Sequence, residues 1–315
     1  MARQVLAVDI GGTKLAAGLV DDDGLVLGSG RTPTTAGASG EELWDALVGL
    51  TERVLRDGGS PDLVGVGIGS GGPMQWPSGD ISPLNIPGWR DFPLRERFRE
   101  RYPGVPVRVH NDAVAVAIAE HWRGAARGTE NMLGMVVSTG VGGGLVLGGR
   151  VVDGMSGNAG HIGHVVVDPE SPPCVCGGVG CLEAVARGPA LAEWAYDQGW
   201  RTDRPADQRT GNDLGDDARV GHEIAVAAFA RAGRALGIAI ASVKSLCDVE
   251  VVAIGGGVSQ VGDLLFDPLR ATLERHAGLE FTKRVRVVPA ALGQDAGLVG
   301  AAALVHRGER YWSAD

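Results

Sequence analysis

The 315-residue chain has few aromatic side chains and only four cysteines. Phe, Trp and Tyr make up 5% of its residues, although 44% of the residues are hydrophobic. The sequence also lacks the unbroken run of ~20 apolar residues that a transmembrane helix requires. Asp9 and the glycines after it come too early in the chain for a secretory signal peptide. These absences predict a globular cytoplasmic protein that does not associate with a membrane.

Clusters of positive charge are missing as well. The net charge is −9, and no run of Lys and Arg stands out, which disfavours a protein that binds the phosphate backbone of a nucleic acid. The motif G-x-x-x-x-G-K-[ST] is absent, and this excludes a P-loop NTPase. Residues Gly67 to Gly72 match G-x-G-x-x-G after a strand, but Pro73, Pro77 and Gly79 follow them. No helix N-terminus is therefore expected there for a dinucleotide.

Three of the four cysteines lie close together in the sequence. Cys174, Cys176 and Cys181 follow His164 within 17 positions. Zinc binds thiolates and imidazole in tetrahedral sets, and a short loop commonly supplies three thiolates. The alternative is a disulfide, but Cys174 and Cys176 are too close to pair comfortably and one thiol would remain over. The spacing favours a zinc site, whereas Cys247, in an apolar segment, is expected to be an inert core thiol.

Alternating apolar segments and glycine-rich turns indicate an α/β protein. The first three strands are expected to form an antiparallel meander. A strand, a glycine turn and a second strand then recur later in the chain, which suggests two related lobes with a boundary near Asp112. Residues 203–217 are polar and are expected to form a solvated loop. Strands are expected at residues 4–9, 15–20, 25–30, 63–68, 105–109, 132–138, 145–147 and 249–254, and helices at 41–56, 112–122 and 221–247.

Three glycine turns follow predicted strands. They comprise residues 9–13, 139–144 and 255–257. Glycine allows backbone N–H groups to approach phosphate oxygens, and the carboxylate of Asp9 can orient a hydrated Mg²⁺. One such turn alone is equally compatible with a hairpin that binds nothing. Three in one chain favour binding of nucleotide phosphates.

A polar pair, Asn111 and Asp112, lies where a predicted buried strand meets a helix. Asp at a helix start is usually an N-cap, and this reading explains Asp112 without any function. In the functional reading Asp112 is a general base that accepts a proton from an attacking hydroxyl. The phosphate-type turns in the same chain favour the functional reading.

Taken together, these motifs resemble those of the ROK family of sugar kinases and repressors, across essentially the whole chain. The matching segments are DIGGTK (9–14), HND (110–112), STGVGGG (138–144), GNAGHIGH (157–164), CVCGGVGCLE (174–183) and GGGV (255–258). The resemblance implies an α/β, actin-like ATPase (ribonuclease H-like) fold. It has a smaller lobe of residues 1–112, onto which a helix at 297–307 packs back, and a larger lobe of residues 113–296. ATP and a sugar would bind in the cleft between them, and residues 164–183 would form an inserted zinc-binding loop.

The resemblance also implies roles for individual residues. Asp112 would be the catalytic base. Zinc would be structural, held by His164, Cys174, Cys176 and Cys181, with the second ring nitrogen of His164 left for the sugar. ATP and Mg²⁺ would be bound by Asp9, Gly11, Gly12, Thr13, Lys14, Thr139, Gly140, Gly142, Gly143, Gly255, Gly256 and Gly257. The sugar would be contacted by Gly71, in a sugar-side loop or hinge at 67–72, and by Asn85, Asn111, Asp112, His161, His164 and Glu183.

One position departs from the family pattern. The usual E-x-G-H at the sugar site reads His161-Ile162-Gly163-His164 here. Neutral imidazole offers one donor and one acceptor in place of a permanent negative charge. Some kinases of the family that resemble this chain act on amino sugars such as kanosamine, the 3-amino analogue of glucose. Glucose and an amino-glucose therefore both remain candidate substrates.

The expected function is an ATP-dependent kinase that phosphorylates the 6-hydroxyl of a hexopyranose. One alternative is a sugar-responsive transcriptional regulator, but only eight residues precede Asp9, and no DNA-binding element fits there. A second alternative is a non-catalytic sugar-binding module, which the presence of Asp112 and the phosphate turns disfavours. The resemblance further suggests a homo-oligomer, either a dimer or a tetramer.

Overall fold

The computed structural model describes residues 3–205 and 210–314. The chain divides into two compact units, each assembled from separate segments. The first contains residues 1–130, 144–160 and 292–315, and the second contains residues 131–143 and 161–291. The expected boundary after Asp112 falls inside the first unit, because the helix that begins at Asp112 packs against the C-terminal helix of that same unit.

The first unit is built on a five-stranded sheet with the order β3-β2-β1-β4-β7. Its strands β1, β2 and β3 pair antiparallel, which confirms the predicted meander. Strands β4 and β7 extend the sheet in parallel from β1. The carboxyl ends of β1, β4 and β7 therefore meet at one edge of the sheet. The strands span Gln4–Ile10 (β1), Lys14–Val20 (β2), Val26–Pro33 (β3), Leu63–Ser70 (β4) and Val107–Asn111 (β7).

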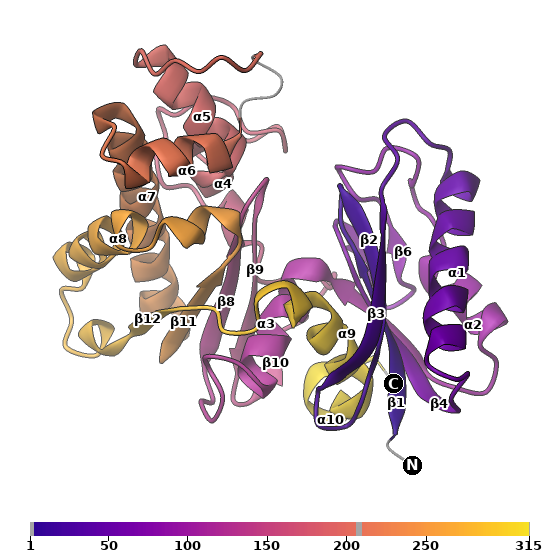
Figure 1. Cartoon of the computed structure of the whole chain (residues 1–315). Coiled ribbons are helices and arrows are strands. Elements are labelled where there is room, and N and C mark those ends of the chain that lie inside the picture. Colours follow the sequence, from indigo (N-terminus) through magenta and orange to yellow (C-terminus); the bar gives the residue numbers. More distant parts are fainter. Residues whose placement is uncertain (1–2, 206–209, 315) are drawn as a thin grey trace. The chain divides into compact units, whose positions relative to one another are not determined.

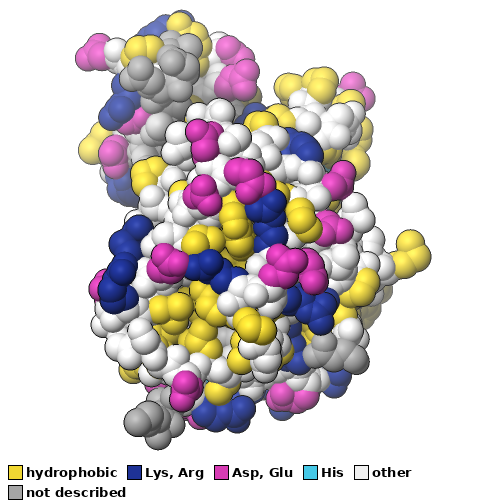
Figure 2. Space-filling view, turned by 90° about the vertical axis from the view of Figure 1, so that its right-hand side faces the viewer, with side chains coloured by type: hydrophobic (Ala, Val, Ile, Leu, Met, Phe, Trp, Pro, Cys, Tyr) yellow, Lys and Arg dark blue, Asp and Glu magenta, His cyan; other side chains and the backbone are white. Residues whose placement is uncertain are grey.

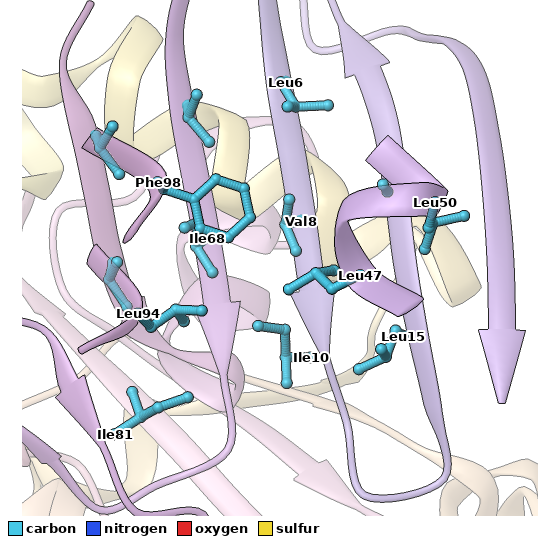
Figure 3. Close-up of a cluster of buried hydrophobic side chains, with 14 of the residues drawn as sticks. Leu6, Val8, Ile10, Leu15, Leu47, Leu50, Ile68, Ile81, Leu94 and Phe98 are labelled. Carbon is cyan, nitrogen blue, oxygen red and sulfur yellow. The ribbon is translucent and has the colours of Figure 1, made fainter. Parts of the chain in front are cut away.

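Both faces of this sheet are covered by helices (Figure 1). Alternate residues of β1 point to opposite faces. Leu6, Val8 and Ile10 pack with leucines of α1 (Gly40–Asp57) and α2 (Leu94–Arg101) in the buried cluster of Figure 3. Val5 and Ala7 pack on the opposite face with Leu298 of α9 (Ala296–His306). Helix α3 (Asp112–Trp122) packs beside α9.

The second sheet has the order β10-β9-β8-β11-β12. Its parallel strands are β8 (Met132–Val137), β11 (Val251–Gly255) and β12 (Arg286–Pro289). β9 (Val141–Leu147) starts in the second unit and continues into the first, where β10 (Arg150–Val151) pairs with its end. Outside both sheets, β5 (Met74–Gln75) and β6 (Asp80–Ile81) form a small hairpin.

The helices of the second unit surround the long helix α7 (Glu223–Cys247). They are α4 (Leu182–Ala186), α5 (Gly188–Asp197), α6 (Gly211–Arg219) and α8 (Asp263–His276). By length and composition alone, α7 could cross a membrane, although the sequence was expected to contain no segment that is long and apolar enough. However, 61% of the most apolar 18-residue stretch of α7 is buried inside the protein. Contacts with α4, α5, α6 and α8 account for that burial.

The expectation of a solvated loop over residues 203–217 was wrong for its second half. Thr210 caps α6 by accepting a hydrogen bond from the Asp213 backbone N–H, and the Asp213 side chain accepts one from Thr210. Leu214 is fully buried. Capping by polar side chains and one apolar anchor thus make a helix out of an Asp-rich segment. Residues 206–209 of the expected loop lie outside the described residues.

Short helices complete the chain. They are the 3₁₀ turns at Ile162–His164, Gly257–Val261, Thr282–Arg284 and Gly293–Asp295, and α10 at Gly308–Tyr311. On the face of the molecule shown in Figure 2, acidic and basic side chains are interspersed among hydrophobic ones.

Candidate functional site

In the first unit, the turn between β1 and β2 holds the first group of predicted site residues. Asp9 is the next-to-last residue of β1, and Gly12, Thr13 and Lys14 are exposed. The Gly11 N–H donates to the Lys14 carbonyl at 3.0 Å, so this N–H group closes the turn. Burial raises the pKa of the Asp9 carboxyl, while the charges of Lys14 and Arg31 oppose the rise.

Space beside Asp9 is left by two glycines. A Cβ atom on Gly297, in the first turn of α9, would lie 2.5 Å from Asp9 Oδ2. A Cβ on Gly69 of β4 would lie 3.9 Å from Asp9 Oδ1 and 3.5 Å from the Asp112 Cα. The positive end of the α9 dipole and the carboxylate therefore lie together. The positive end of the dipole favours the ionised Asp9 carboxylate, and carboxylate oxygens are the type of ligand that Mg²⁺ accepts, directly or through water.

The sequence left open whether Asp112 caps helix α3 or acts as a general base, and the structure at the start of α3 bears on this choice. Asn111, and not Asp112, is the N-cap: its Oδ1 accepts hydrogen bonds from the backbone N–H groups of Ala113 at 3.0 Å and Val114 at 3.4 Å. Its Nδ2 donates to the Ser70 carbonyl at 3.4 Å. Asp112 is the first helical residue. The N-cap explanation therefore applies to Asn111 and leaves the function of Asp112 to be explained.

The environment of Asp112 suits a proton acceptor. Burial raises the pKa of its carboxyl to about 6, and the negative charge of Asp9 adds to the rise. A hydrogen bond from the Ala113 N–H to Oδ1, at 2.8 Å, opposes it. A carboxylate whose pKa lies near neutrality is ionised at pH 7 and is a stronger base than an ordinary aspartate.

Two further predicted residues lie in the same unit. Gly71 follows β4, and its N–H donates to the Ile10 carbonyl at 3.1 Å. Asn85 is exposed and packs against the β1–β2 turn so closely that a Cβ on Gly12 would lie 2.6 Å from the Asn85 Cβ. The fold therefore brings Asn85 to the phosphate-type turn. Residues 67–70 belong to β4, so the strand predicted at 63–68 continues for two more residues and the expected loop or hinge at 67–72 begins only at Gly71.

In the second unit, two glycine turns meet at the carboxyl ends of β8 and β11. A Cβ on Gly256 would lie 2.3 Å from the Val137 carbonyl oxygen, and one on Gly257 would lie 3.9 Å from Ser138 Oγ and 3.6 Å from Asn212 Oδ1. Gly256 has a φ of 95°, a conformation that glycine adopts readily. Close approach of two backbones thus requires glycine here.

The turn before β9 is shorter than its sequence suggested. It comprises Ser138, Thr139 and Gly140, because β9 already begins at Val141. Gly142 and Gly143 are therefore strand residues. The expectation that they belong to a phosphate-type turn was wrong. Thr139 is exposed, and the Ser138 N–H donates to the Gly140 carbonyl at 2.8 Å.

The predicted zinc ligands come together in the second unit. The ligand atoms of His164, Cys174, Cys176 and Cys181 all lie within 4.8 Å of one another. Cys176 Sγ lies 3.8 Å from Cys181 Sγ, and Cys174 Sγ lies 3.9 Å from His164 Nδ1. Zn–S bonds of about 2.3 Å in a tetrahedron give S···S edges of about 3.8 Å. All the cysteines are free thiols, so the geometry fits a zinc ion and not a disulfide.

Without a metal ion, the three thiols of this cluster differ in how tightly they hold their protons. Burial raises the pKa of the Cys181 thiol to about 12 and raises that of Cys174 as well. A hydrogen bond from the Gly178 N–H, at 3.4 Å, lowers the pKa of Cys176. Three neighbouring thiolates repel one another, and a divalent cation supplies the charge that holds them together.

Glu183 connects this cluster to the turn before β9. Its Oε2 accepts a hydrogen bond from the Val141 N–H at 2.8 Å, and its Oε1 lies 3.9 Å from Cys174 Sγ. A Cβ on Gly163 would lie 2.0 Å from the Val141 carbonyl oxygen, so the histidine-bearing loop also packs against this residue. The His161 and His164 rings are 6.2 Å apart and nearly parallel. His161 and Glu183 thus lie beside the zinc cluster.

Sequence reasoning missed several polar residues around these groups. Ser138 and Asn212 lie against Gly257, and His110 pairs with Asp153. His110 and Ser138 belong to the motifs that carry the family resemblance, but no role was assigned to either. Asp153 and Asn212 have no local signal, because only the tertiary fold brings them to their partners.

Comparisons with known proteins agree over almost the full length of the chain. Residues 5–308 match the ROK family. A glucokinase from Thermotoga maritima is 34% identical, covering 96% of this chain and 97% of its own length. An N-acetylmannosamine kinase from Escherichia fergusonii is 36% identical, covering 97% and 99%.

A solved structure is similarly close. The ROK family glucokinase from Streptomyces griseus, in complex with glucose and AMPPNP, superimposes with a TM-score of 0.84 at 34% identity, covering 97% of this chain and 100% of that one. The α/β, actin-like ATPase fold that the motifs implied is confirmed. The chain belongs to the ROK family.

Proposed function

We propose that this protein is an ATP-dependent sugar kinase that transfers the γ-phosphoryl group of ATP to the 6-hydroxyl of a hexopyranose. The observation that carries the proposal is Asp112, a partly buried carboxyl group with a pKa raised to about 6, at the start of α3 in a ROK-family chain. The names of the relatives support the substrate class, since glucokinases and an N-acetylmannosamine kinase all phosphorylate sugars.

In the proposed reaction Asp112 accepts the proton of the attacking hydroxyl. The glycine turns that follow β1, β8 and β11 present backbone N–H groups for ATP phosphates. Asp9 would hold Mg²⁺ through water, and this cation would neutralise charge on the transferring phosphoryl group. The residues proposed to contact the sugar are Gly71, Asn85, Asn111, His161, His164 and Glu183. Asn111 acts partly through its cap, which fixes the backbone beside Asp112.

The zinc cluster has a structural role in this proposal. Its four ligands fix the loop that carries His161, His164 and Glu183, which are proposed to contact the sugar. Because His164 Nδ1 is the ring nitrogen directed toward Cys174, Nε2 is the one left for a sugar hydroxyl. The cation thereby orients side chains and activates no water.

Replacing Asp112 with Asn tests the central assignment. The amide has nearly the same shape but cannot accept the proton, so kcat should fall by about 10²–10⁴-fold. Sugar binding, measured by calorimetry, should be largely retained. Asp57→Asn, at the exposed end of α1, is the matched control and should have wild-type kcat. Near-normal turnover by the Asp112 variant would remove this residue from its role.

The identity of the sugar is proposed to depend on His161. A neutral imidazole and a carboxylate rank hydroxyl, amino and acetamido substituents differently, since only the imidazole can donate a hydrogen bond. Glucose and a 3-amino or 2-amino glucose are the proposed substrates. The test is a panel of glucose, kanosamine, glucosamine, mannose and N-acetylmannosamine, assayed by ADP release with wild type and His161→Glu. An identical ranking by both proteins contradicts a role of His161 in specificity.

A further inference from the structure

A chain of hydrogen bonds in the first unit runs from exposed Ser313 through two buried side chains to the backbone next to Asp112. His110 is fully buried in β7, and its Nε2 lies 2.9 Å from Oδ1 of Asp153, which is 8% exposed. Ser313, near the C-terminus, donates from Oγ to Asp153 Oδ2 at 2.5 Å. On the other side of the ring, His110 Nδ1 accepts the Asn111 backbone N–H at 2.8 Å.

These partners determine the tautomer of His110. Nδ1 accepts a hydrogen bond, so its lone pair is in use and the ring proton resides on Nε2. The two carboxyl oxygens of Asp153 accept hydrogen bonds from His110 and Ser313. The carboxylate therefore fixes the ring in the one tautomer that can accept the Asn111 N–H.

One tryptophan also packs beside the His110 ring, and a second tryptophan packs against the first. The Trp76 ring lies 5.5 Å from the His110 ring, and the Trp312 ring lies 4.6 Å from that of Trp76. Trp312 and Ser313 are adjacent in sequence. Trp312 therefore packs beside this network, and Ser313 supplies one of its donors.

The peptide that His110 holds is the one that orients Asp112. Asn111 is the N-cap of α3, and Asp112 follows it directly. Burying a carboxylate and an imidazole is costly compared with burying two apolar side chains of similar volume. Stability alone therefore does not account for this pair at this place.

We propose that His110 and Asp153 are positioning residues for Asp112. Trp312 and Ser313 contribute to the same positioning through their contacts with Trp76 and Asp153. The inference rests on the proposed function of Asp112 as the base. It assigns a role in turnover to the C-terminal end of the chain. Small misplacements of a reacting group cost up to about 10²-fold in rate, so the network should affect kcat more than substrate binding.

The test separates positioning from stability. In the double variant His110→Leu/Asp153→Leu the buried charge is gone and an apolar pair fills the space, so the protein should keep much of its thermal stability. The Asn111 N–H has then lost its acceptor, and kcat should fall by about 10–100-fold while KM for sugar and ATP changes little. Asp153→Asn is the conservative variant. Its amide oxygen still accepts from Nε2, so most of the kcat should be retained.

Ser313→Ala keeps the inference testable if the double variant does not fold. It removes one donor to Asp153 near the chain end, and it should lower kcat with KM unchanged, whereas Ser29→Ala, at an exposed position of β3, should not. A stable double variant with wild-type kcat overturns the inference. So does a Ser313→Ala kcat equal to that of Ser29→Ala. If the wild type phosphorylates no sugar of the panel, the proposed function fails instead.

Discussion

Two adjacent residues at the start of α3 have different roles: Asn111 caps the helix, and Asp112 is the proposed proton acceptor. Asn111 supplies the side-chain acceptor that the first backbone N–H groups of the helix need. Asp112 Oδ1 also accepts the Ala113 N–H, but the helix has its N-cap without Asp112. The negative charge of Asp9 acts on the Asp112 carboxyl, and the small residue Gly69 lies against both residues. A carboxylate near a second carboxylate, in a buried place, holds its proton more tightly than usual. This gives Asp112 the basicity that a proton acceptor needs.

The raised pKa of Asp112 predicts how its replacement changes stability with pH. The folded state favours the protonated carboxyl, so the stability that the group contributes is present below pH 4 and is lost as the pH rises through about 6. A rise from 3.8 to about 6 corresponds to about 3 kcal/mol. Asp112→Asn should therefore be more stable than wild type at pH 8, by up to this amount, and equally stable at pH 4.

Urea denaturation of both proteins at pH 4, 6 and 8 measures this difference. The wild-type free energy of unfolding should drop relative to that of the variant between pH 4 and pH 7. In the same pH range, kcat/KM of the wild type should rise with pH, with a midpoint near 6. A stability difference that does not vary with pH contradicts the assigned environment of Asp112.

At the scale of elements, short apolar runs bounded by turn residues were a sufficient guide to the first sheet. The meander of β1, β2 and β3, the helix α1 and the strand–helix junction at Asp112 were all predicted close to their observed bounds. Glycine-rich segments were harder to assign, because glycine occurs both in turns and in strands that pack closely against a neighbouring backbone. Gly142 and Gly143 lie in β9, and Gly67 and Gly69 lie in β4, where a side chain on Gly67 would clash with α9.

Long-range pairs in the candidate site could not be predicted from sequence. The zinc ligands were found because their spacing is itself a chemical signal. The pairing of His110 with Asp153 and Ser313 has no local pattern, since the partners come from three distant segments of the chain. The cap of α6 by Thr210 was readable in principle, but the surrounding aspartates suggested solvent exposure.

The zinc loop should lose its order when the metal is removed. Cys174, Cys176 and Cys181 lie in and beside tight hydrogen-bonded turns, and binding of a metal is coupled to the folding of such a loop. We expect one zinc per chain by plasma emission spectroscopy. After chelation, hydrogen exchange should accelerate in residues 164–183, and the melting temperature should fall.

Cysteine variants provide the matched comparison for the zinc site. Cys176→Ser removes one thiolate of the cluster and should abolish stoichiometric zinc. Cys247→Ser, at the end of α7, should retain it, because Cys247 is not part of the cluster. Absence of zinc from freshly purified protein that has not met a chelator would rule out the assignment.

On the scale of the whole molecule, each compact unit is assembled from segments that are far apart in the sequence. The first unit contains the first 130 residues, but it also needs residues 144–160 and 292–315. Helix α9, from the last of these segments, covers the face of the first sheet formed by Val5, Ala7, Ala16 and Val20. One face of the N-terminal sheet therefore stays uncovered until the C-terminal part of the chain is present.

Truncation should show this dependence directly. A chain that ends at Ala291 exposes that face of the first sheet, and we expect it to be aggregated or protease-sensitive, while a chain that ends at Trp312 should fold. A graded version is Leu298→Ala, which should cost about 2–5 kcal/mol because Leu298 is buried in this cluster. Leu246→Ala is the control, since Leu246 is 86% exposed and should change stability by less than about 0.5 kcal/mol. A soluble, protease-resistant fragment of residues 1–291 would show that the first unit folds without α9.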